Sequence, residues 1–233
     1  MTPSLDEEPL RGLLTRLHGR SLSQEGETRA FLKTGGDATI VGAAEAIEAG
    51  RPFWRDKLVA LDADKARFCY QICRSMNART VVEAGTSLGV STLYLAAAVR
   101  DNGGGLVIAT EWEPEKAALA RAHFAEAGLS AFIDLREGDL RETLTHSMPS
   151  SIDVLLLDIW TPMARPAAEI VAPRMRRGAV MLTDNTARRR TEYGDLLAYL
   201  EDPSTGFMTQ TLPFDGGLEF SVKWRDSRPG VSS

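Results

Sequence analysis

The spacing of hydrophobic residues divides the chain into two stretches. In residues 1–78, apolar positions recur three and four residues apart, and Gly or Pro separates one run from the next. That spacing places apolar side chains on one face of a helix. The stretch therefore predicts amphipathic helices and no strand, with helices expected at 8–20, 37–50 and 62–76.

From residue 80 onward, short apolar runs alternate with helical patterns. This alternation is typical of a mostly parallel sheet whose strands are joined by crossover helices. The longest apolar run, SIDVLLLDIW at 151–160, is the expected central strand, because a strand covered on both faces is apolar throughout. The other expected strands of this type are 80–85, 105–112, 133–139 and 179–185, and the expected helices are 90–100, 115–128, 164–175 and 191–202.

The last part of the chain shows a different pattern. Segments 207–214 and 217–224 flank Asp215-Gly216-Gly217, a hairpin turn signal, so the sheet should end in an antiparallel pair. The expected fold class is α/β, with a Rossmann-like, doubly wound, mostly parallel sheet of seven strands, an antiparallel C-terminal hairpin and an N-terminal helical cap. The expected divisions are a helical cap at 1–78, a core at 79–225 and a flexible tail at 226–233.

Length, composition and charge narrow the class of protein. The chain has 233 residues, 43% of them hydrophobic, and a formal net charge of −5. This length supports one full core, and the mild acidity argues against a nucleic-acid surface, which needs clustered Lys and Arg. No apolar stretch is long enough to span a membrane, and the acidic first residues do not resemble a signal peptide. We therefore expect a cytoplasmic protein that binds neither nucleic acid nor membrane.

Two short groups of residues receive structural interpretations. The run Arg188-Arg189-Arg190 is expected to open a helix as a solvated face. Cys69 and Cys73 share a helix face and are too few for a disulfide framework or a closed zinc site, so we expect them in the core.

A glycine-containing segment follows the first expected strand. Glu83-Ala84-Gly85-Thr86-Ser87-Leu88-Gly89 has the pattern ExGxxxG, whereas a dinucleotide pyrophosphate site uses GxGxxG. Glycine at this place lets the backbone approach a ligand closely. Glu111 ends the second strand, where a carboxylate can accept both hydroxyls of a ribose. Together they predict a nucleoside site that is not a nicotinamide or flavin site.

The segment VVEAGTSLGVSTLYLA resembles the first motif of class I S-adenosylmethionine (SAM)-dependent methyltransferases. The resemblance covers about residues 60–224 and is to the branch that contains catechol and caffeoyl-CoA O-methyltransferases and their bacterial relatives. It implies SAM as cofactor and a homodimer. The cofactor-binding residues that it implies are Glu83, Gly85, Thr86, Ser87, Gly89 and Ser91 for the methionine and ribose part, Glu111 for the ribose, and Trp112, Gly138 and Asp139 for the adenine.

Two of these assignments have structural alternatives. Ser91 could be an ordinary serine in the first turn of a helix. Asp139 is followed three residues later by Glu142, an arrangement that caps a helix without any ligand.

Oxygen-bearing side chains also follow the fourth and fifth expected strands. Asp158 ends the fourth strand and Asp184-Asn185 end the fifth, so on adjacent parallel strands their side chains would converge. Carboxylate and amide oxygens suit Mg²⁺ or Ca²⁺ better than zinc. The resemblance implies the same three residues as metal ligands, with Asp158 also beside the cofactor and in the reaction. The alternative is that Asp158 contacts only the cofactor and Asp184-Asn185 form a turn.

A bound cation would explain how a hydroxyl becomes a nucleophile. A phenol has a pKa near 10 and is mostly protonated at neutral pH. A divalent cation stabilises the phenolate and orients it toward the methyl group. The sequence thus predicts a divalent-metal-dependent O-methyltransferase, with Mg²⁺ or another divalent cation, that acts on a small hydroxylated, aromatic acceptor.

The chain departs from the family pattern at one position. The family carries a lysine as general base three residues after the first metal aspartate, and this chain has Thr161 there. Either the metal acidifies the acceptor without a base, or another group such as Lys57, Lys65 or His146 acts as the base. No spacing supports these three residues, and each is expected on the surface.

Other readings of the same residues stay open. Trp54 and Trp160 could form walls of the acceptor pocket or pack in the core. Asp153 lies at the start of its strand, away from the expected site, and is expected to have a structural role. The competing functions are a metal-independent N- or O-methyltransferase, and a SAM-binding protein without transferase activity.

Overall fold

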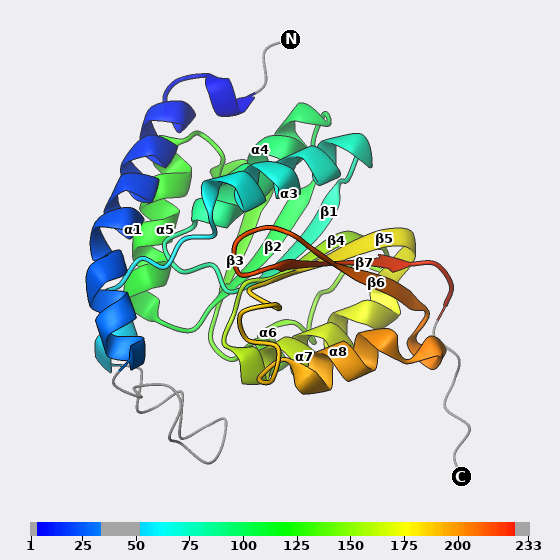
Figure 1. The fold of residues 1–233 in the computed structure, drawn as a ribbon. Coiled ribbons are helices and arrows are strands. Elements are labelled where there is room, and N and C mark those ends of the chain that lie inside the picture. Colours follow the sequence, from blue (N-terminus) through cyan, green and yellow to red (C-terminus); the bar gives the residue numbers. More distant parts are fainter. Residues whose placement is uncertain (1–3, 34–51, 227–233) are drawn as a thin grey trace.

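The computed structural model describes residues 4–33 and 52–226 (Figure 1). The helix expected at 37–50 and residues 227–233 of the expected tail lie outside the described residues. None of the described helices is long and apolar enough to cross a membrane.

A seven-stranded sheet forms the middle of the molecule. Its strand order is β3-β2-β1-β4-β5-β7-β6, and β7 runs antiparallel to both β5 and β6. This confirms the expected fold class, with the longest apolar run as the central strand β4. The strands are β1 (Thr80–Ala84), β2 (Leu106–Glu111), β3 (Ile133–Glu137), β4 (Ile152–Leu157), β5 (Met175–Asp184), β6 (Phe207–Leu212) and β7 (Leu218–Lys223).

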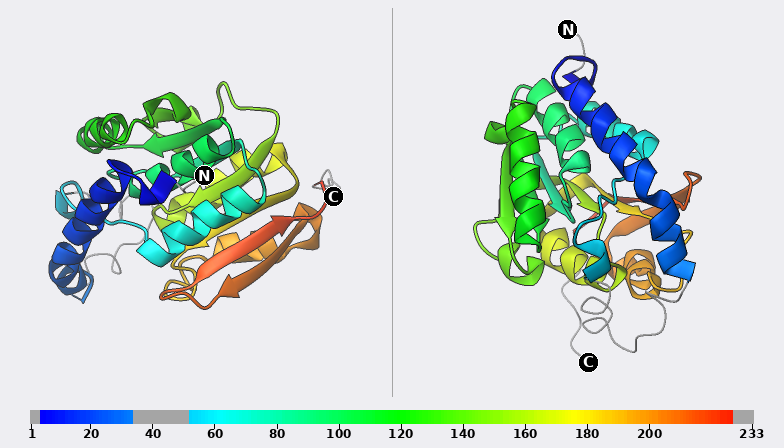
Figure 2. Two further views of the ribbon diagram at one scale, coloured as in Figure 1. Left: turned by 90° about the horizontal axis from the view of Figure 1, so that it is seen from above. Right: turned by 90° about the vertical axis from the view of Figure 1, so that its left-hand side faces the viewer.

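Helices cover both faces of the sheet (Figure 1; Figure 2 shows the same layers from two other sides). Successive residues of a strand point to opposite faces, so Val81 packs in the core on one side and Val82 in the core on the other. The first face carries α1 (Leu10–Lys33), α3 (Ala63–Ser75), α4 (Val90–Asp101) and α5 (Pro114–Glu126), and the second carries α6 (Leu140–Thr143), α7 (Thr161–Val171) and α8 (Gly194–Glu201).

Two helices differ from the sequence expectation. Helix α1 does not end at residue 20, as expected, but continues through Gly26 to Lys33. An isolated glycine costs a helix only about 1 kcal/mol relative to alanine, which the buried leucines of the helix offset. Helix α8 begins at Gly194, so Arg188-Arg189-Arg190 lie in the preceding turns and do not open the helix as expected.

Two structural interpretations are confirmed. Cys69 and Cys73 are free thiols buried in α3. Asp153 lies at the amino end of β4, away from the carboxyl edge. Its carboxylate accepts hydrogen bonds from the backbone N–H groups of Arg79 and Thr80 and from the Arg176 guanidinium.

Gly85 allows the two central parallel strands to meet at their carboxyl ends. Its φ is +100°, and a Cβ at this position would lie 2.0 Å from the backbone carbonyl oxygen of Asp158. The motif glycine is therefore required by contact with the protein itself, in addition to any contact with a ligand.

Replacing Gly85 tests this packing. Gly128 is the matched control, because its φ is +65° but a Cβ added there would meet no atom within 4 Å. Gly128→Ala should lower the free energy of unfolding by about 1–2 kcal/mol through backbone strain alone. Gly85→Ala should lower it by at least about 2 kcal/mol more, because the carbonyl must move. Urea unfolding of both variants measures the difference, and equal losses would contradict the proposed clash.

Candidate functional site

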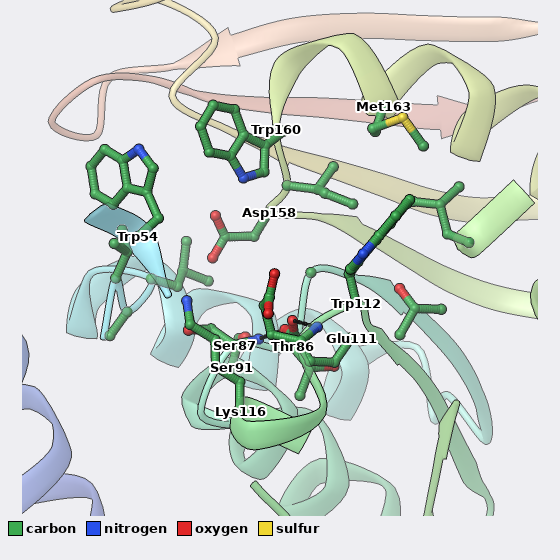
Figure 3. Close-up of a pocket in the computed structure, with 18 of the residues that line it drawn as sticks. Trp54, Thr86, Ser87, Ser91, Glu111, Trp112, Lys116, Asp158, Trp160 and Met163 are labelled. Carbon is green, nitrogen blue, oxygen red and sulfur yellow. Dashed lines mark hydrogen bonds between the residues drawn. The ribbon is translucent and has the colours of Figure 1, made fainter. Parts of the chain in front are cut away.

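A pocket opens at the carboxyl ends of the parallel strands, beside the place where the strand order reverses between β1 and β4. This is where open α/β sheets hold their ligands. Its volume is about 280 Å³, near the lower end for small-molecule sites. Of the residues expected in the site, the pocket is lined by Gly85, Thr86, Ser87, Ser91, Glu111, Trp112, Gly138, Asp158 and Asn185 (Figure 3).

Glu111 is held firmly at one end of this pocket. One carboxylate oxygen accepts a hydrogen bond from the Ser87 backbone N–H at 2.7 Å, and the other accepts one from the Glu113 backbone N–H at 2.8 Å. Burial raises the pKa of Glu111, and these N–H groups and the nearby Lys116 ammonium oppose the rise. Each oxygen keeps a lone pair for a further donor, and Trp112 lies next to it on the pocket wall.

Glu83 lies beneath the pocket and does not line it. Its side chain is fully buried, and one oxygen accepts hydrogen bonds from the hydroxyls of Thr86 and Thr92. Among the described residues, its other oxygen has no hydrogen-bond partner, and neither has the buried hydroxyl of Ser87. Burial raises the pKa of Glu83 to about 7, although the hydroxyls oppose the rise. Ser87 has a φ of +49°, an uncommon backbone conformation that clusters at ligand sites.

Two predicted cofactor residues have structural roles and do not line the pocket. A Cβ at Gly89 would lie 2.4 Å from the Phe124 ring, so this glycine permits α5 to pack. Asp139 accepts a hydrogen bond from the Arg141 backbone N–H at 2.8 Å and caps α6. The capping alternative therefore describes Asp139 in this structure.

Asp158 lies at the other end of the pocket. It is half-buried, and its side chain lies between the Trp160 indole and the residues around Ser87 (Figure 3). No donor within the described part of the chain reaches its carboxylate. Burial raises the pKa of Asp158 well above its usual range, and the carboxylates of Asp184 and Glu83 raise it further.

Two indole rings form the wall beside Asp158. Trp54 and Trp160 both line the pocket, and their rings meet edge to face with centroids 6.2 Å apart. Of the two readings of these residues, the structure thus favours the pocket wall. The buried Trp54 Nε1 finds no hydrogen-bond partner in the part of the chain that the structure describes. Thr161, in the place of the family lysine, also lines the pocket.

Lys65 is not on the surface, and that expectation was wrong. Its side chain is fully buried, and its ammonium lies 2.6 Å from Asp184 Oδ1 and 3.1 Å from Asp62 Oδ2. Burial lowers the pKa of Lys65, but the two carboxylates outweigh burial and raise it above the ordinary value. The helical spacing could have revealed this, because Lys65 shares the buried face of α3 with Cys69, four residues later.

The other candidate bases lie outside the pocket. Lys57 pairs with Glu27 and Asp56, and His146 is exposed. Neither residue lines the pocket.

Asp184 and Asn185 are in contact at the end of β5. The Asn185 side-chain amide donates to Asp184 Oδ2, while Asp184 Oδ1 accepts from Lys65. Asn185 lines the pocket, whereas Asp184 is almost fully buried behind it.

Arg189 and Tyr193 are among the pocket residues that the sequence analysis missed. Arg189 lines the pocket, although it was expected on a solvated face, and Tyr193 lines it from a buried position. Burial raises the pKa of Tyr193, and the negative charges of Asp158 and Asp184 raise it further. The Tyr193 phenol is therefore close enough to both carboxylates to interact with their charges. Neither residue belongs to a pattern that marks a site, because both lie in the turns after β5.

Comparison with known proteins indicates the class of protein to which this pocket belongs. Residues 82–186 match a family model described as a methyltransferase domain. The chain is a SAM-dependent methyltransferase, and it groups with the O-methyltransferases.

Relatives of the methyltransferase agree on this class. It is 26% identical over 164 residues to a catechol O-methyltransferase of Niastella koreensis, covering 64% of this chain and 71% of the relative. It is 27% identical over 179 residues to a catechol O-methyltransferase of Mycobacterium tuberculosis, covering 77% and 76%. The solved structure of the O-methyltransferase TomG from Streptomyces achromogenes in complex with SAM has the same fold, with a TM-score of 0.65 at 20% identity, covering 84% of this chain and 96% of that one.

Glu83 should make the stability of the ligand-free methyltransferase depend on pH. Its pKa is about 7 in the folded protein against an ordinary value of 4.5, so the folded state binds the proton more tightly. The resulting stabilisation is fully present below pH 4.5 and is lost as the pH rises through 7. It amounts to at most roughly 3 kcal/mol.

Urea unfolding of the wild type and Glu83→Gln at pH 5 and pH 8 measures this contribution. Glutamine does not titrate and can still accept from Thr86 and Thr92, so the variant should lose less stability between the two pH values. The same pH dependence in both proteins would show that Glu83 is ionised throughout.

Proposed function

We propose that this enzyme transfers the methyl group of SAM to a hydroxyl of a small aromatic acceptor. The main observation behind this proposal is that the two ends of one pocket carry different groups. Glu111 lies at one end, and a carboxylate without a donor, Asp158, lies beside two indoles at the other. The catechol O-methyltransferases among the relatives support transfer to an aromatic hydroxyl.

The residues present fit SAM. Glu111 offers carboxylate lone pairs to ribose hydroxyls, and the unpartnered hydroxyl of Ser87 offers one more polar contact. We propose that the cofactor is held by Gly85, Thr86, Ser87, Ser91, Glu111, Trp112 and Gly138. Glu83 supports this loop from beneath, through Thr86.

The acceptor end suits a flat ring that carries a hydroxyl. Trp54 and Trp160 provide aromatic surface, and Asp158 can accept the hydrogen bond of the hydroxyl. SAM supplies the methyl group, and the electron pair of the broken carbon–sulfur bond remains on sulfur. As the acceptor oxygen bonds to the methyl carbon, its proton passes to Asp158, whose raised pKa favours the protonated form.

The residues present do not fit the expected divalent cation. Two carboxylates and an amide are the right donor types for Mg²⁺. However, both oxygens of Asp184 already accept hydrogen bonds, one from Lys65 at 2.6 Å and one from the Asn185 amide. The proposed reaction therefore contains no metal step.

Other expectations stay predictions. The homodimer, the cytoplasmic location and the division into a cap at 1–78 and a core at 79–225 rest on the sequence and the resemblance alone.

The proposed function is tested with SAM and a panel of catechols, monophenols and matched aromatic amines. We expect formation of S-adenosylhomocysteine and a methyl ether, detected by mass spectrometry, with catechols or phenols and not with the amines. Asp158→Asn should lower kcat by about 100-fold or more, because the proton acceptor is lost.

The binding of SAM separates this effect from misfolding. Its Kd should change little in Asp158→Asn, because this side chain faces the acceptor end. Methylation of amines alone would favour an N-methyltransferase. Tight SAM binding without turnover on any acceptor would favour the SAM-binding protein without transferase activity.

Glu111 should control the affinity for SAM. Glu111→Ala removes a charged acceptor of two hydroxyl hydrogen bonds, each worth about 1.5–3 kcal/mol, so the Kd of SAM should rise at least about tenfold. Isothermal titration calorimetry measures the change. Glu126→Ala, which removes an exposed partner of Arg16 far from the pocket, is the matched control and should bind as the wild type does. Unchanged affinity in Glu111→Ala would place the ribose elsewhere.

A further inference from the structure

A buried ammonium lies directly behind the acceptor end of the pocket. Lys65, in the first turn of α3, has no exposed surface, and its ammonium contacts Asp184 Oδ1 at 2.6 Å and Asp62 Oδ2 at 3.1 Å. Asp62 precedes α3, and Asp184 ends β5 on a distant part of the chain. Two elements thus place carboxylates around one cation.

Burying an ammonium group such as that of Lys65 costs free energy unless nearby negative groups compensate its charge. An unpaired ammonium in the interior loses its hydration, and only close anions in good geometry restore that loss. Lys65 meets this condition because Asp184 is also almost fully buried and lies at charge-assisted hydrogen-bond distance. The ammonium is therefore a fixed part of the site.

The position of the ammonium conflicts with a divalent cation. Oxygen ligands of Mg²⁺ or Ca²⁺ lie about 2.0–2.6 Å from the metal, and the Lys65 nitrogen already lies 2.6 Å from Asp184 Oδ1. A second cation on the same carboxylate would be repelled by the ammonium. The remaining predicted ligand on β5, Asn185, directs its amide N–H toward Asp184.

We infer that the Lys65 ammonium supplies the positive charge at the acceptor site, that its ion pair with Asp184 prevents this carboxylate from binding a divalent metal, and that methyl transfer in this enzyme is metal-independent. The inference rests on the proposed function for its activity tests. Lys65 does not line the pocket, so it is a positioning residue: it fixes Asp184, whose other oxygen holds the amide of the pocket residue Asn185.

The wild-type protein provides the first test. Protein treated with EDTA and dialysed should keep at least half of its activity, and added Mg²⁺ should not raise it. Electron paramagnetic resonance with Mn²⁺, in the presence of S-adenosylhomocysteine, should show no bound ion up to about 1 mM, the weak end of protein sites for hard divalent cations. Loss of activity in EDTA that Mg²⁺ restores, or Mn²⁺ binding by the wild type, would overturn the inference.

The second test removes the ammonium. Lys65→Met keeps an unbranched side chain that is one atom shorter and carries no charge. Asp184 is then free, so the variant should gain a Mn²⁺ site and lose at least tenfold in kcat. Lys57→Met is the matched control, because Lys57 also pairs with two carboxylates but lies outside the pocket, and it should bind no Mn²⁺ and keep its activity. A folded Lys65→Met that binds no Mn²⁺ would count against the inference.

The outcomes for the two proposals differ. Activity that requires Mg²⁺ would overturn the role of Lys65 and leave the O-methyltransferase intact. Absence of turnover on every acceptor would overturn the proposed function, and the Mn²⁺ measurements would still decide whether Lys65 excludes a metal. If Lys65→Met does not fold, the two wild-type measurements decide alone.

Discussion

The need to compensate buried carboxylates governs the carboxyl edge of this sheet. Threonine hydroxyls donate to one oxygen of Glu83, whose pKa is raised. Two backbone N–H groups donate to Glu111, and the Lys65 ammonium pairs with Asp184. Asp158 receives no donor within the described chain, although its neighbours are negative. A buried carboxylate without a hydrogen-bond donor is stabilised by taking up a proton or by a nearby positive charge. Glu83, Glu111 and Asp184 thus each receive donors from the protein, whereas Asp158, the proposed proton acceptor, receives none from the described chain.

The topology of the sheet explains why the sequence locates most of this site. Parallel strands that alternate with helices all end at one edge, so a polar residue after an apolar run is directed to a common pocket. Glu111 and Asp158 follow such runs, and both line the pocket. The same rule identifies the central strand, because the uninterrupted apolar run at 154–157 of β4 is buried on both faces of the sheet. Periodicity and strand ends were sufficient for these features.

Contacts between distant segments explain what the sequence did not provide. Lys65 reads as one more lysine near a helix start, and only the packing of α3 against the sheet brings it to Asp184. Arg189 and Tyr193 reach the pocket from irregular turns, which carry no periodic signal. Gly89, which the motif assigned to the cofactor, is required by the Phe124 ring. A motif identifies the positions that matter, but it does not separate contacts with ligand from contacts with the protein.

Thr161 and Lys65 together determine where positive charge lies at this end of the pocket. A lysine at 161 would place an ammonium in the pocket wall, in contact with the acceptor. Here the ammonium lies one layer deeper, where two carboxylates hold it protonated and no solvent reaches it. A cation in that position cannot exchange a proton with the acceptor, but it offsets part of the effect that the negative charge of Asp184 has on Asp158. In the proposed reaction, proton transfer falls to Asp158, and Lys65 contributes to the electrostatic environment of that step.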